Sequence, residues 1–478
     1  MDDLHYLSAT EARRMFRDRK LSPVELLQAL IDRAEKVEPS INAFAETHYD
    51  SALKEARAAE AVYMKKDATP RALEGIPVAV KEEAPIKGQK NTLGSLALKD
   101  YVADHTAVFV QRILDAGGIV HARTTTPEFS CTAVTWSRLW GVTRNPWNLD
   151  FAPGGSSGGT ASSLAAGTTT LATGSDIGGS IRMPASMCGV VGFKPPYGRI
   201  PEVEIFNLDQ YCHEGPLART VDDAALLENV IAGPHPSDVV SLRPKLEIPD
   251  IQPGVSGVRL AVSYDLGCYN VDAEVVANLR ASVQKLRDAG AVVEEVSLPW
   301  KMDEIGRACD IHFGMIFGPS IKEIYDRSAD LLTPYARRLY EDGRRITKDD
   351  YLEGLVLEAK IYEPLGHVLD GYDALLCPTF IVPALPAEWD HEPQVVNGRP
   401  TKNWFEILMT VPFNICSRCP VMSVPSGRAS NGVPTGMSIV GKTYDDVTVF
   451  QVARAFEKAQ PWLDVPERRP VIAAPVAR

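Results

Sequence analysis

Two glycine-rich stretches place serines where a bare backbone could expose a nucleophile. The first reads PGGSSGGTASS at 153–163, and the second reads GSDIGGSIRMPAS at 174–186. Glycine loses more conformational freedom on folding than any other residue, so two such stretches are costly to order. We therefore look for the chemistry of this chain first in these hydroxyl groups and in the backbone around them.

Three interpretations of the two stretches are weak. A phosphate-binding P-loop would end in Gly-Lys-Ser or Gly-Lys-Thr, which neither stretch does. Tight turns without chemistry would explain one serine-bearing loop more readily than two. A serine hydrolase with a histidine base needs a His and Asp partner, and the only histidine near the centre is His213, beside Glu214.

The fourth interpretation is a serine nucleophile activated by a lysine. Ser180 follows Gly178 and Gly179, so its hydroxyl group stands on a backbone without neighbouring side chains. The N–H groups of Ile177, Gly178, Gly179 and Ser180 could converge on one point and form an oxyanion hole. Each such donor is worth about 3–4 kcal/mol of transition-state stabilisation in other hydrolases.

The elements around these loops predict an α/β protein. Ser8 and Ser22 each precede an acidic residue by three positions, which is typical of a helix start. A short β-rich run at 75–81 predicts a buried strand that ends at Lys81. Strands are further expected at 118–122, 259–265, 291–299, 373–379 and 419–427, and helices at 51–65, 106–116, 158–166, 273–290, most of 303–370 and 444–459.

Composition excludes several classes of protein. The 478 residues include 50 Lys and Arg against 62 Asp and Glu, a net charge of −12 without a basic run, which disfavours nucleic acid and anionic membranes as partners. No apolar run is long enough to span a bilayer, and the N-terminus is acidic, so we expect a cytoplasmic protein. The eight cysteines are spread along the chain, which favours free thiols. Cys416 and Cys419 form a lone CxxC that we assign to packing, so we expect no metal and no cofactor.

The two stretches, GGSSGG and SDIGGSIRMPASMCGVVGFKP, resemble the signature of the amidase signature family. GIPVAVK at 75–81, TRNPWN at 143–148, GPLARTVDDAALLENVIAG at 215–233 and NGVPTGMSIVGK at 431–442 also resemble it. The resemblance runs from about residue 8 to 463. It implies one domain over 1–478, with a mixed, twisted β-sheet covered by helices on both faces. Within it we expect a helical segment at 1–65, a signature core at 70–230, a variable region at 232–370 and a C-terminal part at 371–478.

The resemblance also implies a catalytic triad. Ser180 takes the place of the nucleophile, Ser156 that of the bridging serine after a cis peptide bond, and Lys81 that of the base. Ser175 and Asp176 match a pair that we expect to orient Ser156 and its loop. Arg182 is expected to be a structural ion-pair partner. Ser157 is expected to make local hydrogen bonds or to cap the helix at 158–166.

The two residues after Lys81 depart from the family pattern, because Glu82 and Glu83 stand where Asp-Asn is common. Burial would favour a neutral lysine, which can act as a base, and nearby carboxylates would favour the charged form. Side chains alternate along a strand, so if the strand extends beyond Lys81, Glu83 is expected on the face of Lys81 and Glu82 on the opposite face. We therefore expect an alkaline pH optimum.

The substrate is the least determined feature. Segments that vary in the family contain aromatic residues, so the pocket is expected to accept an apolar or aromatic amide, anilide or carbamate. The candidates for its lining are Phe129, Trp136, Tyr211, Phe313, Phe317, Trp404, Phe405, Phe413 and Cys416. A free-standing amidase with a small-molecule substrate is the leading hypothesis. The alternatives are a glutaminase subunit of a tRNA-dependent amidotransferase and a non-catalytic binding protein, and the sequence leaves open whether the chain forms a homodimer.

Overall fold

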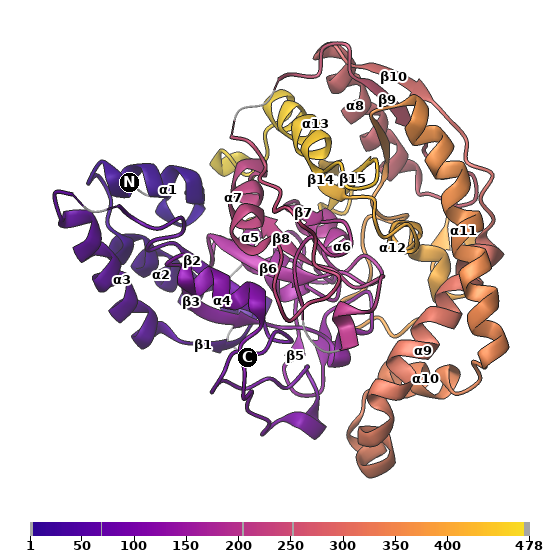
Figure 1. The fold of residues 1–478 in the computed structure, drawn as a ribbon, viewed down its shortest axis with the longest axis horizontal. Coiled ribbons are helices and arrows are strands. Elements are labelled where there is room, and N and C mark those ends of the chain that lie inside the picture. The colour runs from indigo at the N-terminus through magenta and orange to yellow at the C-terminus, as the bar shows by residue number, and fades with distance from the viewer. Residues whose placement is uncertain (1–2, 68, 203–204, 251–252, 473–478) are drawn as a thin grey trace.

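The computed structural model describes residues 3–67, 69–202, 205–250 and 253–472. Within them an 11-stranded mixed sheet runs through the molecule, with helices on both sides (Figure 1). In spatial order its strands are β1 (Phe44–Thr47), β3 (Ile119–Thr124), β2 (Pro77–Lys81), β6 (Leu171–Ser175), β8 (Glu214–Ala218), β7 (Val191–Lys194), β14 (Val421–Arg428), β15 (Pro434–Gly441), β11 (Ala374–Pro378), β9 (Arg259–Val262) and β10 (Val292–Glu295). This is the α/β architecture that the sequence predicted.

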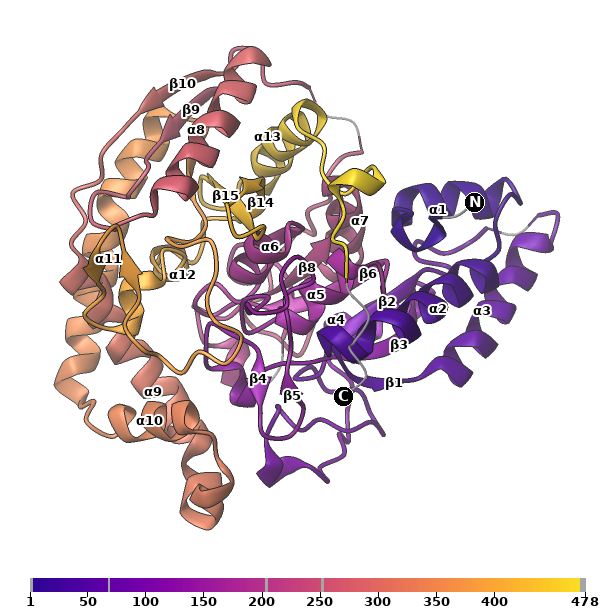
Figure 2. The same ribbon diagram turned by 180° about the vertical axis from the view of Figure 1, so that it is seen from behind.

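Helices cover the sheet and also lie beyond both of its ends. The N-terminal helices α1–α3 lie at one end and the helices α9–α11 at the other, as both views show (Figures 1 and 2). The helices are α1 (Ala9–Arg17), α2 (Pro23–Ile41), α3 (Tyr49–Met64), α4 (Val108–Asp115), α5 (Gly158–Ala166), α6 (Arg182–Cys188), α7 (Val221–Ile231), α8 (Ala273–Asp288), α9 (Met302–Ser328), α10 (Pro334–Gly343), α11 (Lys348–Gly371), α12 (Pro412–Ile415) and α13 (Asp446–Ala459). Within the described residues, no helix is both long and apolar enough to cross a bilayer.

Local signals in the sequence place several helices correctly. The Ser8 side chain accepts a hydrogen bond from the Glu11 amide, and Ser22 forms a complete capping box with Glu25. The helix expected at 158–166 has those bounds, and the strands β9 and β10 pair in parallel around α8, as expected of a βαβ unit. Two small two-stranded ribbons lie outside the main sheet: β4 (Trp136–Ser137) with β5 (Gly141–Val142), and β12 (Val395–Val396) with β13 (Arg399–Pro400).

The strands at the centre of the sheet bring the predicted site residues to one edge. β2 pairs in parallel with β6, with Val78 opposite Leu171 and Ala79 opposite Ala172. Lys81 and Ser175 are the last residues of these two strands, so both lie at the carboxyl edge of the sheet. Parallel strands place the residues that follow them at a common edge, where loops can carry function.

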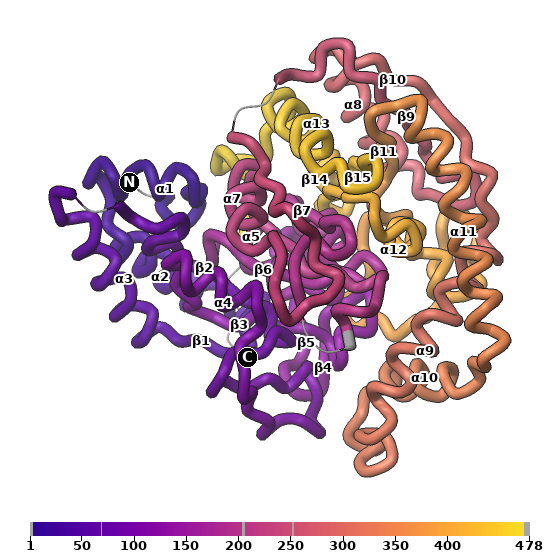
Figure 3. Tube along the Cα trace, viewed as in Figure 1, coloured from indigo at the N-terminus to yellow at the C-terminus, as the bar shows by residue number. Residues whose placement is uncertain are grey.

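The C-terminal part of the chain completes the sheet beside this edge. β14 pairs antiparallel with β7, with Val421 opposite Lys194, although the two strands are far apart in sequence. Figure 3 shows this meeting of the middle of the chain, in magenta, with its C-terminal part, in yellow. As a consequence, the segment that leads into β14 packs against the loop that follows β6.

Candidate active site

Lys81 is almost fully buried at this edge, with 1% of its side chain exposed. Its Nζ donates a hydrogen bond to Ser156 Oγ at 2.7 Å and another to Ser175 Oγ at 2.9 Å. A third oxygen, Glu83 Oε1, lies 2.9 Å away. Two hydrogen bonds and one ion pair therefore hold the Lys81 side chain.

The GGSSGG loop holds Ser156 against the lysine. The peptide bond between Gly155 and Ser156 is cis, as the resemblance implied. A side chain on Gly155 would collide with the backbone of residues 132–134, which explains why glycine stands there. Ser157 joins this loop to the second one, because its amide donates to the Ser180 carbonyl at 3.2 Å.

Ser157 was expected either to make local hydrogen bonds or to cap the helix at 158–166. Ser157 occupies the N-cap position of α5, but its side chain accepts no hydrogen bond from the first turn. Its hydroxyl group instead donates to the Ser175 carbonyl at 3.4 Å, which is the local hydrogen bonding expected as the alternative. Ser175 has no direct hydrogen bond to Ser156 within the described residues. The Ser175 hydroxyl group accepts a hydrogen bond from Lys81, so Ser175 is linked to Ser156 only through that lysine.

Asp176 organises the loop that carries Ser180. Its carboxylate accepts hydrogen bonds from the Gly179 amide at 2.8 Å and the Ile181 amide at 3.2 Å. The Gly179 amide therefore already donates to an acceptor within the protein. This corrects the expectation that it contributes to an oxyanion hole. The amides of Ile177, Gly178 and Ser180 make no hydrogen bond within the described part of the chain and remain candidates for that role.

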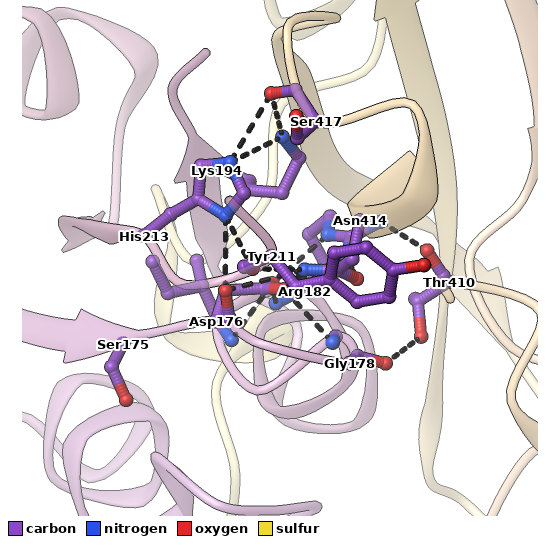
Figure 4. Close-up of polar contacts among 12 residues, drawn as sticks. Ser175, Asp176, Gly178, Arg182, Lys194, Tyr211, His213, Thr410, Asn414 and Ser417 are labelled. Atoms are coloured by element: carbon purple, nitrogen blue, oxygen red, sulfur yellow. Dashed lines mark hydrogen bonds and ion pairs between the residues drawn. The ribbon is translucent and has the colours of Figure 1, made fainter. Parts of the chain in front are cut away.

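A buried ion pair fixes this carboxylate (Figure 4). Arg182 binds Asp176 through Nε at 2.9 Å and NH2 at 2.8 Å, with both side chains fully buried. Burial raises the pKa of Asp176, but the Arg182 guanidinium outweighs burial and leaves that pKa below its ordinary value. Arg182 is thus an ion-pair partner, as expected.

Two residues that the sequence did not single out anchor the same loop from the C-terminal part of the chain. Asn414 Nδ2 donates to Asp176 Oδ1 at 2.8 Å, and Thr410 Oγ1 donates to the Gly178 carbonyl at 2.6 Å (Figure 4). The Thr410 carbonyl in turn accepts from Arg182. The only signal for them in the sequence is their place just before the CxxC segment.

His213 does not act on the serines. Its Nδ1 faces the carbonyl groups of Asp176 and Tyr211, and its Nε2 faces Lys194 and the Ser417 carbonyl (Figure 4). Burial and then Lys194 lower its pKa to about 3, so it stays neutral over the physiological range. A histidine-based hydrolase is therefore not supported.

The two glutamates after Lys81 lie in the turn that follows β2 and point to different sides. Because the strand ends at Lys81, the turn and not strand alternation sets their directions. Glu83 binds Lys81 through Oε1, and its Oε2 accepts a hydrogen bond from Ser130. Glu82 is buried on the other side, where its carboxylate accepts from the amides of Thr92 and Gly94. Burial raises the pKa of Glu82 to about 7.

Two cavities that share part of their lining contain the two serines, Ser180 in one and Ser156 in the other. The first, here called the Ser180 slot, has a volume of about 30 Å³ and is lined by Ser130, Cys131, Thr132, Ala133, Ile177, Gly178, Ser180, Met183, Phe313, Phe317, Leu339, Trp404 and Leu408. The second, the Ser156 cavity, has a volume of about 470 Å³ and contains Ser156, Ser175 and Glu83 in its wall. Ser130, Ile177 and Phe317 line both.

The structure places only some of the predicted lining residues at the cavities near the serines. Phe313, Phe317 and Trp404 line the Ser180 slot, and Phe129 lines the Ser156 cavity. Phe405 borders a third cavity, of about 350 Å³, whose wall also includes Phe313, Leu339 and Trp404. The slot thus shares an aromatic wall with a larger space.

The other four candidates belong to the packing of the protein and line neither serine-containing cavity. Tyr211 stacks on His312, Phe413 packs edge-on against Trp300, and Trp136 donates to the Trp389 carbonyl. Cys416 is buried with a free thiol. Their aromatic or apolar type could not distinguish a wall from a core, because both environments favour it.

The CxxC motif forms no metal site in the described ranges. Cys416 and Cys419 are both buried free thiols whose pKa burial raises. No group of three or more His, Cys, Asp or Glu side chains in the part of the chain that the structure describes could hold a metal ion.

Known proteins with similar sequences and structures identify the family. The sequence matches the Amidase family over residues 25–450. It is 31% identical over 473 residues to an acylamidase of Rhodococcus erythropolis, covering 97% of each chain. It is also 32% identical over 487 residues to a subunit of the glutamyl-tRNA(Gln) amidotransferase of Moorella thermoacetica, covering 96% of this chain and 97% of the other.

Solved structures agree with this result. A bacterial aryl acylamidase of the amidase signature enzymes superposes with a TM-score of 0.91 at 29% identity, covering 98% of this chain and 100% of the other. The corresponding subunit of the glutamyl-tRNA(Gln) amidotransferase of Thermotoga maritima superposes with a TM-score of 0.76 at 28% identity, covering 99% of each chain. The chain belongs to the amidase signature family and is a hydrolase of carbon–nitrogen bonds.

Proposed function

We propose that this protein is a free-standing amidase that cleaves an amide or anilide with a short, apolar acyl group through an acyl-enzyme on Ser180. The observation that carries the proposal is the contact of Lys81 Nζ with Ser156 Oγ at 2.7 Å, in a buried site beside the Ser180 loop. A buried lysine beside a hydroxyl group can move protons without a metal ion or a histidine.

In the first step, neutral Lys81 accepts the proton of Ser156 while Ser156 accepts the proton of Ser180. Ser180 Oγ forms a bond to the carbonyl carbon, and the negative charge passes to the carbonyl oxygen. The free amides of Ile177, Gly178 and Ser180 are the candidate donors to that oxygen.

In the second step, the protonated Lys81 returns a proton through Ser156 to the amide nitrogen. The carbon–nitrogen bond then breaks, the amine leaves, and the acyl group stays on Ser180. A water molecule attacks this ester through the same relay, and a carboxylic acid is released. Because Ser156 delivers the proton, the leaving amine lies on the side of the Ser156 cavity and the acyl group in the Ser180 slot.

The lining of the Ser180 slot favours this activity over glutamine hydrolysis. None of the slot's lining residues has a charged side chain. Glutamine would place its ammonium and carboxylate groups on the acyl side, where burial without partners is costly. The higher structural similarity to the aryl acylamidase than to the amidotransferase subunit points the same way.

Labelling and turnover test the proposal together. A fluorophosphonate is expected to modify wild type at Ser180, and Ser180→Ala is expected to lose both labelling and anilide hydrolysis while keeping its circular dichroism spectrum. Ser157→Ala serves as the matched control, because Ser157 points to the Ser175 carbonyl. Labelling at another serine, or glutamine hydrolysis faster than anilide hydrolysis, would contradict the proposal.

A further inference from the structure

The Ser156 cavity carries an unusual excess of carboxyl groups. Glu83, Asp104, Glu202 and Glu214 are in its wall, and its lining contains no Lys or Arg. The histidine of the lining, His105, is bound to Asp104 at 2.8 Å. This wall therefore gathers four carboxyl groups without a Lys or Arg among its lining residues.

Two carboxyl groups of this wall, Glu202 and Glu214, have no hydrogen-bond or ion-pair partner in the described part of the chain. Glu214 is the one that strand pairing places next to the relay. It is the first residue of β8 and stands opposite Ser175 in the antiparallel pair with β6, so its side chain lies on the same face of the sheet as the Ser175 hydroxyl that binds Lys81. The residue is only 8% exposed. Across the described ranges, its carboxylate makes no hydrogen bond and no ion pair.

The neighbouring carboxyl groups do not compensate for Glu214. Both oxygens of Glu83 are engaged, one by Lys81 and the other by Ser130. Burial, followed by repulsion from Glu83, raises the pKa of Glu202 to about 8, and burial also raises the pKa of Glu214. Lys81 favours the ionised form of Glu214, but burial and the neighbouring carboxyl groups outweigh it and favour the protonated form. A cation that enters the cavity would favour the ionised form and pair with it.

The apolar lining residues of the Ser156 cavity indicate the chemistry of the rest of the ligand. Phe109, Phe129 and Phe317 surround the cavity together with Leu93 and Ile324. Such walls suit an aromatic or aliphatic body, while the carboxyl groups suit a positively charged end and repel an anion. A ligand with an apolar body and a positively charged end therefore fits both the apolar residues and the carboxyl groups of the lining.

We propose that the Ser156 cavity binds a leaving amine that bears a second, positively charged amino group, so that the preferred substrate is a monoacylated diamine. This inference rests on the proposed function, because the relay through Ser156 is what places the leaving amine in this cavity. The scissile nitrogen lies near Ser156, the apolar body spans the aromatic walls, and the ammonium group pairs with Glu214.

A pair of anilides that differ only in charge tests the inference. N-[4-(aminomethyl)phenyl]acetamide and N-(4-ethylphenyl)acetamide have leaving groups of nearly the same shape, and only the first carries an ammonium group. We expect wild type to cleave the cationic anilide with a kcat/KM at least tenfold higher. Glu214→Gln is expected to bring that ratio close to one, whereas Glu247→Gln, which removes an exposed surface charge, is expected to preserve it.

Two further measurements keep the test decisive if Glu214→Gln folds poorly. With wild type alone, 4-methylbenzylamine is expected to inhibit hydrolysis of the neutral anilide at least tenfold more strongly than 4-methylbenzyl alcohol. Moving the amino group to the acyl side, as in 3-aminopropanoyl anilide against butanoyl anilide, is expected to lower kcat/KM, because the Ser180 slot has no carboxyl group to pair with the ammonium group.

The outcomes separate the two proposals. Equal cleavage of the charged and neutral anilides, or a preference for the cation on the acyl side, overturns the cation site and leaves the amidase activity standing. Failure to cleave any anilide, together with no labelling of Ser180, overturns both. A preference that survives Glu214→Gln and equals that of Glu247→Gln also overturns the assignment to Glu214.

Discussion

Lys81, the last residue of β2, and Glu83, in the turn that follows, form an ion pair with a separation of 2.9 Å inside the candidate active site. The same Lys81 nitrogen binds Ser156 and Ser175. A carboxylate in contact with the ammonium group stabilises its charged form, whereas the proposed relay needs the neutral form. This pair therefore links the pH dependence of the enzyme to one identified side chain.

Removing the Glu83 carboxylate is expected to move the rising limb of the kcat/KM profile to lower pH. The lysine then loses a group that favours its protonated form, so the competent neutral form appears at lower pH. The measurement is anilide hydrolysis by wild type and Glu83→Gln across the pH range.

Glu82→Gln is the matched control, because Glu82 binds backbone amides on the opposite face. A shift in this control as large as that in Glu83→Gln would contradict the assignment. So would a profile that stays flat between about pH 6 and 9, because a lysine relay must titrate.

Glu82 itself is expected to affect the pH dependence of stability. Burial raises its pKa from 4.5 to about 7. For a carboxyl group whose pKa is raised on folding, the stabilisation is present below pH 4.5 and is lost as the pH rises through 7, by about 3 kcal/mol in total. Urea unfolding at several pH values is expected to show a smaller loss in Glu82→Gln than in wild type. Parallel curves for the two proteins would argue against this prediction.

Lys81 and Ser156 are expected to act as one unit. Lys81→Ala should lower kcat by about a thousandfold or more and Ser156→Ala by somewhat less, because each change interrupts the same proton relay. In the double variant the loss should not exceed that of Lys81→Ala by much. If the two losses multiply, the residues contribute independently and the relay is wrong.

Thr410 is expected to position the oxyanion loop. Its hydroxyl group donates to the Gly178 carbonyl at 2.6 Å, and Thr410→Val removes that bond at nearly constant volume. We expect kcat to fall about tenfold while KM changes little, because the bond orients amides that act in the transition state.

Thr379→Val provides the comparison for this change. Thr379 has a buried hydroxyl group that bonds Ser423 and Ser438 in the sheet, so its loss affects stability and leaves the loop in place. Equal reductions of kcat in both variants would show that Thr410 acts only through stability.

Much of the local structure could be predicted from the sequence, because it depends on neighbours along the chain. The cap at Ser22 needs only Glu25 three residues later. The directions of Glu82 and Glu83 do not follow from strand alternation, because β2 ends at Lys81 and both residues lie in the turn after it. The family resemblance could explain why a glycine is needed at position 155. The backbone that this glycine avoids, at residues 132–134, became visible only in the folded protein.

The sequence by itself determined the residue types and their order: a lysine at a strand end, two serine loops and an α/β pattern. The tertiary structure decided which groups meet. It engaged the Gly179 amide with Asp176, anchored Gly178 through Thr410, which lies 232 positions away in the chain, and left Glu214 unpaired beside Lys81 within the described residues. The physical reason is that hydrogen bonds and burial depend on distances in space. A sheet that pairs β7 with β14 creates neighbours that no spacing along the chain encodes.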